Sequence, residues 1–207
     1  MSDQHRDAKF INRHVCYTRE QQLQVIRTLV FEMAELLTRH NVTYFLEAGT
    51  LLGSFRNKGI IPHDTDADFG MDEPGYEYIR DHVLDDLPVG LFLEVWNSTF
   101  HPSDRDDKLP VRLIHKHSAL YLDVFVFLDW TKDGKDVVGP LASWCYFNCA
   151  SCPKVETGGK ELRVPREWIY PLVDCELEGR TMKCPHKTED YLRYVFGGGF
   201  MTPQQYH

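Results

Sequence analysis

One stretch constrains the fold of this chain more than any other: residues 63–70, which read HDTDADFG. In an extended strand, side chains two positions apart lie on one face, so Asp64, Asp66 and Asp68 would point together. The rise of about 3.3 Å per residue would place neighbouring carboxylates close enough to repel one another unless a cation joins them. The pattern therefore predicts a strand end that binds Mg²⁺ or Mn²⁺, hard cations that take carboxylate oxygen.

Two other interpretations of this stretch compete with the metal site. A run of acidic residues is often a solvated loop. Asp-x-Asp-x-Asp also begins an EF-hand calcium loop, but counting from Asp64, position 6 is Phe69 where glycine is needed. Position 12 is Gly75 where a bidentate glutamate is needed, so the spacing excludes the calcium loop.

The segment just upstream argues against a simple acidic loop. Residues 44–56 read YFLEAGTLLGSFR, which indicates a short apolar strand, a Gly49-Thr50 turn and the start of a helix. Backbone N–H groups at such a helix start can hold phosphate oxygens. Arg56 could add a bidentate phosphate contact. Together the two stretches indicate a site for phosphate and metal.

Length and charge restrict the class of protein. The 207 residues suit one domain with a full core, and the formal charge of -8 argues against nucleic acid as the main partner. No apolar run is long enough to span a bilayer, and residues 1–13 lack the apolar core of a signal peptide. We therefore expect a cytoplasmic, single-domain α/β protein without a membrane segment, in which residues 1–15 form a polar N-terminal extension.

Periodicity and turn residues predict the order of the elements. Thr18 and Gln21 fit a capping box at the start of the first helix. A later helix, beginning near Asp72, would bury Ile79 and Val83. The expected helices are 18–40, 49–57, 72–87 and 185–196; the expected strands are 44–47, 66–71, 91–96, 111–115 and 120–128, with a turn at 178–179 and irregular structure over 129–165.

A single charge interrupts the apolar run LYLDVFVFL at residues 120–128. This residue is Asp123, and an unpaired carboxylate buried in such a strand would be strongly destabilising. Asp123 must therefore meet a cation or lie at the exposed edge of a sheet. We expect a metal ligand, with the edge position as the alternative.

Five of the six cysteines follow residue 140. A chain without a secretory signal is expected to hold thiols or a metal, although an even count is compatible with disulfides. Cys145, Cys149 and Cys152 could bind Zn²⁺, with Cys175 or Cys184 as the fourth ligand. Free or disulfide-bonded cysteines are the alternative, and Cys16 is expected to be a small apolar residue.

Residues 45–56 and 59–68 together resemble the LicD family, which includes fukutin and fukutin-related protein. The front motif reads FLEAGTLLGSFR followed by GIIPHDTDAD. The tail is similar to the closing pattern of the family at Tyr170-Pro171-Leu172, Glu178-Gly179, Pro185, Tyr191-Leu192 and Met201-Thr202-Pro203. The chain departs from the family pattern at His63, where the family usually has Trp, and at Thr65, where it often has Asp.

This resemblance implies a nucleotidyltransferase-like fold, with a mixed sheet flanked by helices. It also implies a phosphotransferase that moves an alcohol phosphate, such as phosphocholine or an alditol phosphate, from a CDP-linked donor to a glycan or similar hydroxyl acceptor and releases CMP. Asp66, Asp68 and Asp123 would ligate the Mg²⁺ or Mn²⁺ ion, and Asp64 could act as a base or support the ligands. A transfer of nucleotide from an NTP and a non-catalytic nucleotide-binding protein are the alternatives.

Overall fold

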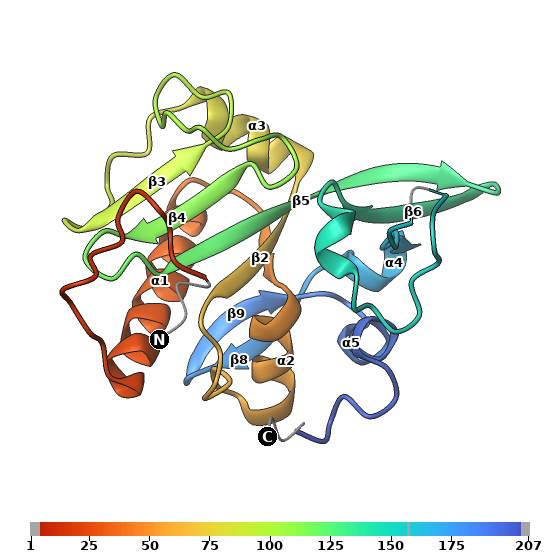
Figure 1. Cartoon of the computed structure of the whole chain (residues 1–207). Coiled ribbons are helices and arrows are strands. Elements are labelled where there is room, and N and C mark those ends of the chain that lie inside the picture. The colour runs from red at the N-terminus through yellow and green to blue at the C-terminus, as the bar shows by residue number, and fades with distance from the viewer. Residues whose placement is uncertain (1–4, 157, 204–207) are drawn as a thin grey trace.

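A seven-stranded mixed sheet forms the centre of this computed structural model, which describes residues 5–156 and 158–203 (Figure 1). Its main path runs β1 (Tyr44–Leu46), β2 (Ala67–Asp72), β5 (Tyr121–Lys132), β4 (Val111–His115) and β3 (Leu91–Val95). β2 and β5 are parallel, and the other neighbours are antiparallel. The second half of β5 pairs with β6 (Lys135–Pro140), which in turn pairs with β7 (Val164–Pro165).

The long helix α1 (Arg19–Arg39) packs against the sheet through one apolar stripe. Ile26, Leu29 and Met33 on this stripe are fully buried. At its start the Thr18 hydroxyl accepts the Gln21 N–H at 3.2 Å, and the Gln21 side chain accepts the Thr18 N–H at 2.8 Å. The predicted capping box is therefore confirmed.

A close approach between β1 and β2 requires a glycine. A Cβ placed on Gly70 would lie 2.1 Å from the ring of Phe45, its register partner on β1. The Phe45 ring in turn meets the edge of Phe127 on β5, with centroids 5.0 Å apart. The aromatic core formed by Phe45 and Phe127 therefore packs against β2.

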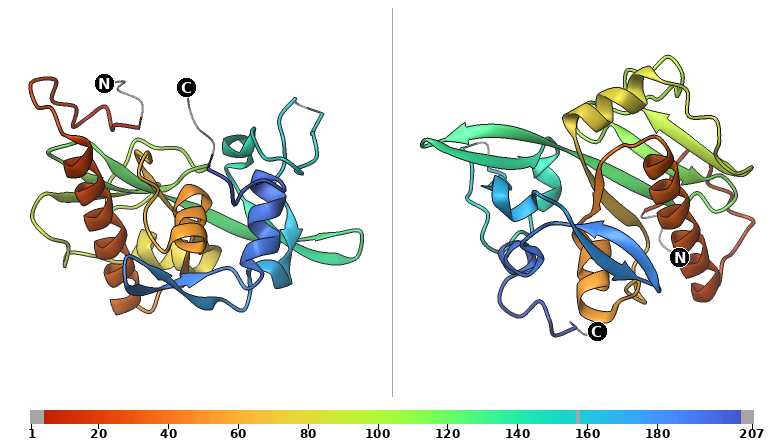
Figure 2. Two further views of the ribbon diagram at one scale, coloured as in Figure 1. Left: turned by 90° about the horizontal axis from the view of Figure 1, so that it is seen from below. Right: turned by 180° about the vertical axis from the view of Figure 1, so that it is seen from behind.

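The hairpin of β8 (Val173–Leu177) and β9 (Arg180–Cys184) lies behind the sheet in the view of Figure 1, as the rear view of Figure 2 shows. Its turn is at Glu178-Gly179, as predicted. The Glu178 N–H donates to the Lys58 carbonyl at 2.8 Å, and its carboxylate accepts the Ile60 N–H at 3.0 Å. The hairpin therefore fixes the loop that leads into the acidic strand.

The remaining helices are short and surround these layers. They are α2 (Ala48–Asn57), α3 (Glu73–Asp81), the 3-10 helix η1 (Ser143–Tyr146), α4 (Arg166–Ile169) and α5 (Thr188–Phe196). None of the helices within residues 5–156 and 158–203 combines the length and the apolar character that crossing a bilayer requires. The predicted mixed sheet flanked by helices is confirmed.

Two predictions of local structure were wrong. The helix that begins after Asp72 ends at Asp81 instead of continuing to 87, and Val83 is 51% exposed rather than buried. The segment 129–165, expected to be irregular, contains η1 and the strands β6 and β7. The first of these two strands, β6, pairs with the end of β5 through a short hairpin.

Candidate active site

The acidic motif lies where two parallel strands begin. Asp68 is the second residue of β2, and its register partner on β5 is Asp123. Asp66 directly precedes β2, and Asp64 lies two residues further upstream. The structure therefore brings the acidic motif beside Asp123, a residue 55 positions after Asp68 in the sequence.

The first turn of α2 packs against this acidic strand. The Asp68 N–H donates to the Thr50 hydroxyl at 3.0 Å, and the Asp68 carbonyl accepts the Glu47 N–H at 3.0 Å. A Cβ placed on Gly49 would lie 2.7 Å from a carboxylate oxygen of Asp64, so a larger residue there would push this side chain aside. The turn predicted to hold phosphate therefore adjoins the carboxylates predicted to hold metal, and a helix start favours anions.

Burial and mutual repulsion leave these carboxylates strongly perturbed. Burial, followed by repulsion from Asp66, raises the pKa of Asp64 to about 7. Burial, followed by repulsion from Asp66 and Asp123, raises the pKa of Asp68 well above its ordinary value. The raised pKa of each residue means that its charged form is disfavoured by burial and repulsion. A bound cation would offset both effects and stabilise the charged form.

Asp123 is paired with an arginine rather than lying at a sheet edge. Arg112 of β4 donates from Nε to one carboxylate oxygen at 2.6 Å and from a terminal nitrogen to the other at 2.7 Å. Arg105 approaches the first oxygen at 3.5 Å. β5 lies between β2 and β4 at this point, so the edge alternative was wrong. The cation that Asp123 meets in this structure is a guanidinium.

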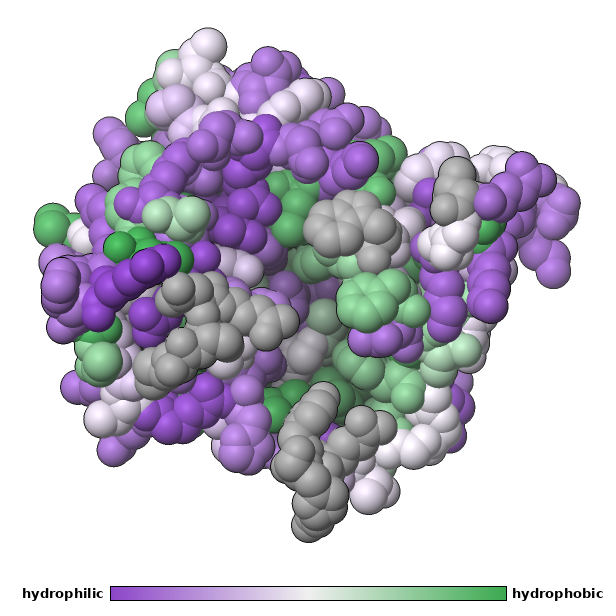
Figure 3. Space-filling view, in the orientation of Figure 1, coloured by the Kyte–Doolittle hydropathy of each residue, from purple (hydrophilic) through white to green (hydrophobic). Residues whose placement is uncertain are grey.

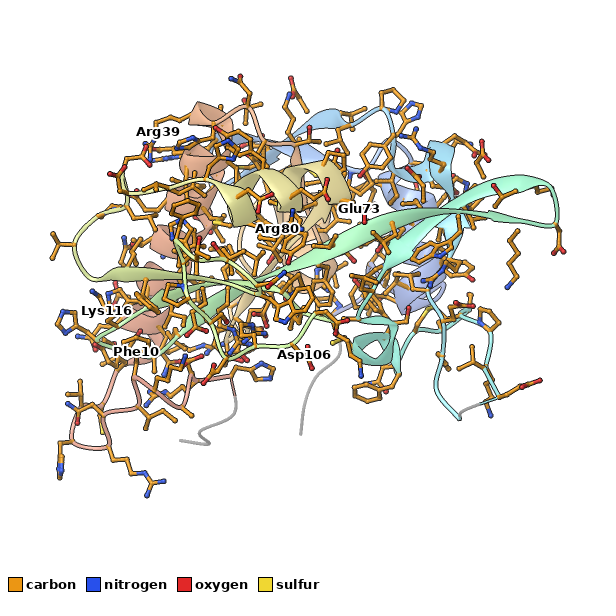
Figure 4. All side chains as sticks on the ribbon, turned by 90° about the horizontal axis from the view of Figure 1, so that it is seen from above. Phe10, Arg39, Glu73, Arg80, Asp106 and Lys116 are labelled. Atoms are coloured by element: carbon orange, nitrogen blue, oxygen red, sulfur yellow. A yellow bond between two sulfur atoms is a disulfide. The ribbon has the colours of Figure 1, made fainter. Side chains whose placement is uncertain are left out.

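The N-terminal segment contributes contacts to the site that the sequence did not predict. His5 Nδ1 lies 2.8 Å from a carboxylate oxygen of Asp66, and Arg112 lies 3.2 Å from the buried Asp7. The hydrogen bond to Asp66 raises the pKa of His5. This segment crosses the front of the sheet in Figure 1. In Figure 4, which is seen from above, Phe10 and Asp106 lie on one side of the sheet and Arg39 lies on the opposite side. The expected polar extension therefore contacts the site through residues 5–7.

Figure 3 shows that this front face is hollowed near its centre. Hydrophilic side chains prevail on the side of the N-terminal segment, and hydrophobic ones gather on the opposite side of the hollow, where Figure 1 has η1 and α5. Cys145 of η1 carries a half-buried free thiol. Burial, followed by the negative charge of Asp123 and Asp68, raises its pKa to about 12, so this thiol lies near the acidic cluster.

The chemistry of the acidic side chains fits a hard divalent cation at Asp66 and Asp68. Their oxygen atoms are the preferred ligands of Mg²⁺ and Mn²⁺. Asp123 would fit as a third ligand only if Arg112 released at least one of its oxygens. Within residues 5–156 and 158–203, no three His, Cys, Asp or Glu side chains form a group that could hold a metal ion.

The cysteines adopt the disulfide alternative. Cys149 is bonded to Cys152, and Cys175 is bonded to Cys184 across the β8–β9 hairpin. Disulfide sulfur lacks the thiolate charge that zinc requires, so the paired cysteines form no zinc site with Cys145. Pairing is favoured here because Cys175 and Cys184 stand close on adjacent strands, with their Cα atoms 5.9 Å apart.

Arg56 does not adjoin the proposed phosphate turn. It lies in the last turn of α2, seven residues and therefore about 10 Å along the helix from Gly49. Its Nε is buried, and the described residues offer it no hydrogen-bond partner. Gly49 and Thr50 thus lie beside the carboxylates, whereas Arg56 begins about two turns farther along α2.

A buried glutamate that the sequence analysis missed lies directly before α2. Glu47 is 0% exposed, and one of its oxygens accepts the hydroxyls of Tyr146 at 2.7 Å and Tyr191 at 2.6 Å. Its other oxygen has no hydrogen-bond partner among the described residues. Glu47 joins the first turn of α2 to η1 and α5, but no local sequence pattern indicates this convergence.

Comparisons with known proteins agree with this architecture. A family model described as "LicD/FKTN/FKRP, nucleotidyltransferase domain" matches residues 41–187. Over 43 residues the chain is 51% identical to uncharacterized proteins of Rickettsia prowazekii and Rickettsia typhi, which is 21% of this chain and 16% and 14% of theirs. Over 63 residues it is 41% identical to the lipopolysaccharide cholinephosphotransferase LicD of Haemophilus influenzae, covering 30% of this chain and 23% of that protein. The matched segments are thus less than a quarter of each relative.

Proposed function

This chain belongs to the LicD family, and we propose that it is a metal-dependent phosphotransferase that acts on a CDP-linked donor. In this proposal it transfers an alcohol phosphate, either phosphocholine or an alditol phosphate, to a hydroxyl of a glycan or similar acceptor and releases CMP. The observation that carries the proposal is the packing of the first turn of α2 against Asp64 and Asp68. A phosphate-binding helix start beside perturbed carboxylates suits displacement at a diphosphate.

The chain's residues have distinct roles in this reaction. Asp66 and Asp68, with Asp123, would hold Mg²⁺ or Mn²⁺. The ion, when bound, supplies positive charge to the phosphate oxygens as the leaving CMP develops its own charge. The N–H groups at Gly49 and Thr50 would hold the donor phosphate, because the first turn of a helix leaves its N–H groups without intrahelical partners. Arg56 starts farther from the donor phosphate and would reach it only through its long side chain.

Asp64 is the candidate general base. Its pKa of about 7 suits proton transfer near neutral pH, since a base is most effective when its pKa is close to the working pH. The Thr65 N–H donates to one of its oxygens at 3.2 Å and fixes the carboxylate in place. Asp64 would accept the proton of the acceptor hydroxyl as that oxygen bonds to phosphorus and the bond to CMP breaks.

The compartment in which the chain works is a further part of the proposal. Two disulfides are typical of proteins that fold in an oxidising compartment. We therefore place the chain in such a compartment, in place of the cytoplasm expected from the sequence.

The test is product analysis. The full chain is incubated with CDP-choline or CDP-ribitol, a hydroxyl-bearing glycan and Mn²⁺, and CMP is measured by chromatography. We expect CMP and a phosphorylated glycan, and neither product after chelation of the metal. Pyrophosphate released from CTP would support nucleotidyl transfer instead. Nucleotide binding without either product would support a non-catalytic binding protein.

A further inference from the structure

Arg112 joins two buried carboxylates, Asp7 and Asp123, that lie far apart in the sequence. Two of its nitrogens donate to Asp123 at 2.6 and 2.7 Å, and a third lies 3.2 Å from an oxygen of Asp7. The side chains of Arg112, Asp7 and Asp123 are only 12%, 10% and 9% exposed. A single guanidinium therefore serves two anions in a region with little water.

This sharing matters because Asp123 cannot serve a metal ion and Arg112 fully at the same time. If Asp123 turned its oxygens to a divalent cation, Arg112 would need another anion. A buried charge that loses its partner is strongly destabilising. Arg105 cannot substitute, because it is itself a cation. Asp7 is the anion that already contacts Arg112.

The position of Asp7 suits this role. Its N–H donates to the Ala119 carbonyl at 2.8 Å, which fixes the backbone beside the start of β5. One oxygen accepts the Lys9 N–H at 3.1 Å, so the other is oriented toward Arg112. The guanidinium also lies over the Tyr121 ring, with its central carbon 3.4 Å from the centroid. That stacking can hold Arg112 in place while its partner changes.

We infer that Asp7 is a positioning residue, which retains Arg112 when Asp123 turns to the divalent cation. This inference rests on the proposed metal-dependent function. Asp7 lies outside residues 41–187, the part of the chain that matches the family model. The N-terminal segment of this chain therefore sets how readily Asp123 becomes a metal ligand, without touching the metal itself.

The decisive measurement is Mn²⁺ affinity of the full chain by isothermal titration calorimetry. We expect Asp7→Asn to weaken Mn²⁺ binding at least tenfold, because Arg112 would be left without an anion in the loaded state. Asp7→Glu should restore most of the affinity, since it keeps the charge. The control is Asp104→Asn, which alters an exposed partner of Lys9 in the same region and should leave the affinity unchanged.

A double variant separates this role from simple anchoring of the N-terminal segment. In an Arg112→Gln background the guanidinium that contacts Asp7 is gone, so adding Asp7→Asn should change Mn²⁺ affinity less than twofold. An equal loss in both backgrounds, or wild-type affinity in Asp7→Asn, would overturn the inference and leave the proposed function intact. If Arg112→Gln does not fold, the comparison of Asp7→Asn with Asp7→Glu decides. Failure of the unmodified chain to bind Mn²⁺ would overturn both proposals.

Discussion

Tyr191 donates its hydroxyl proton to Glu47 at 2.6 Å, although 144 residues separate the two in the sequence. Tyr146 donates to the same oxygen at 2.7 Å. The hydrogen bonds connect α5 and η1 to the residue before α2, and α2 in turn supports the acidic strand through Thr50. A buried glutamate thus links the C-terminal part of the chain to the candidate active site.

Loss of this hydrogen bond should destabilise the chain. Tyr191→Phe removes one of the two donors to a carboxylate oxygen that water cannot reach, and we expect a loss of about 1–3 kcal/mol in the free energy of unfolding. Tyr194→Phe on the same helix is the control, because Tyr194 is outside the Glu47 network. Urea denaturation of both variants measures the difference. Equal stability of the two would show that the Glu47 contacts contribute nothing.

Glu47 should also make stability fall as pH rises. Burial raises its pKa from 4.5 to about 7 in the folded chain, so between these values the unfolded state loses a proton that the folded state keeps. Its stabilising contribution is therefore complete below pH 4.5 and is lost as pH approaches 7, by about 3 kcal/mol at most.

The variant Glu47→Gln isolates this effect, because an amide does not titrate. Between pH 4.5 and 7 the free energy of unfolding of Glu47→Gln should decline less steeply than that of the unmodified chain. The raised pKa values of Asp64 and Asp68 also make stability fall as pH rises. They do so in both proteins, so the difference between the two curves reports Glu47. Parallel curves for the two proteins would contradict the assignment to Glu47.

Removal of one carboxylate from the acidic cluster should separate metal binding from folding. Asp68→Asn should abolish Mn²⁺ binding and turnover, yet raise the melting temperature in metal-free buffer because repulsion from Asp66 and Asp123 is relieved. The matched control is Asp72→Asn at the other end of β2, where asparagine can still cap α3 by accepting the Gly75 N–H. Full activity in Asp68→Asn would disprove its catalytic role.

The cysteines allow a direct choice between disulfides and zinc. Protein denatured without reductant should titrate two thiols, Cys16 and Cys145, whereas an intact thiolate site would expose up to six and release zinc. Replacing Cys175 and Cys184 by alanine should lower the free energy of unfolding by about 2–3 kcal/mol. The disulfide closes a loop in the unfolded chain and so reduces its conformational entropy. Cys16→Ala should leave stability unchanged, since Cys16 is exposed and unpaired.

The sequence predicted the features that depend on local pattern, and it missed those that depend on contacts between distant residues. Period-two spacing correctly placed Asp68 on a strand, although Asp66 lies directly before it. The apolar run identified Asp123 as a charge that needed a cation. Its partner was not identified, because Arg112 alternates with apolar residues as any exposed strand residue would. Only the register of β4 on β5 pairs them.

Some features could have been found by a closer reading of local pattern. Asp133-Gly134 separates β5 from β6, and Asp-Gly between β-branched and aromatic residues is a hairpin signal. No local pattern could have placed His5, Asp7 or Glu47. The side-chain partners that join them to the site are between 61 and 144 residues away, and these contacts exist only after the sheet has formed.

Nucleotide binding should depend on the base. N–H groups at the start of α2 and carboxylate-bound metal recognise a diphosphate whatever its base, so base choice must come from other contacts. The family resemblance implies cytidine, and we expect CDP and CMP to raise the melting temperature more than their adenosine and guanosine counterparts. The stabilisation by CDP, but not that by CMP, should depend strongly on Mn²⁺. A metal ion can bridge the two phosphates of CDP, whereas a monophosphate offers only one. Thermal shift with and without Mn²⁺ measures this, and Asp68→Asn should remove the Mn²⁺ dependence while retaining CMP binding. Equal stabilisation by all nucleotides would contradict a cytidine-specific donor.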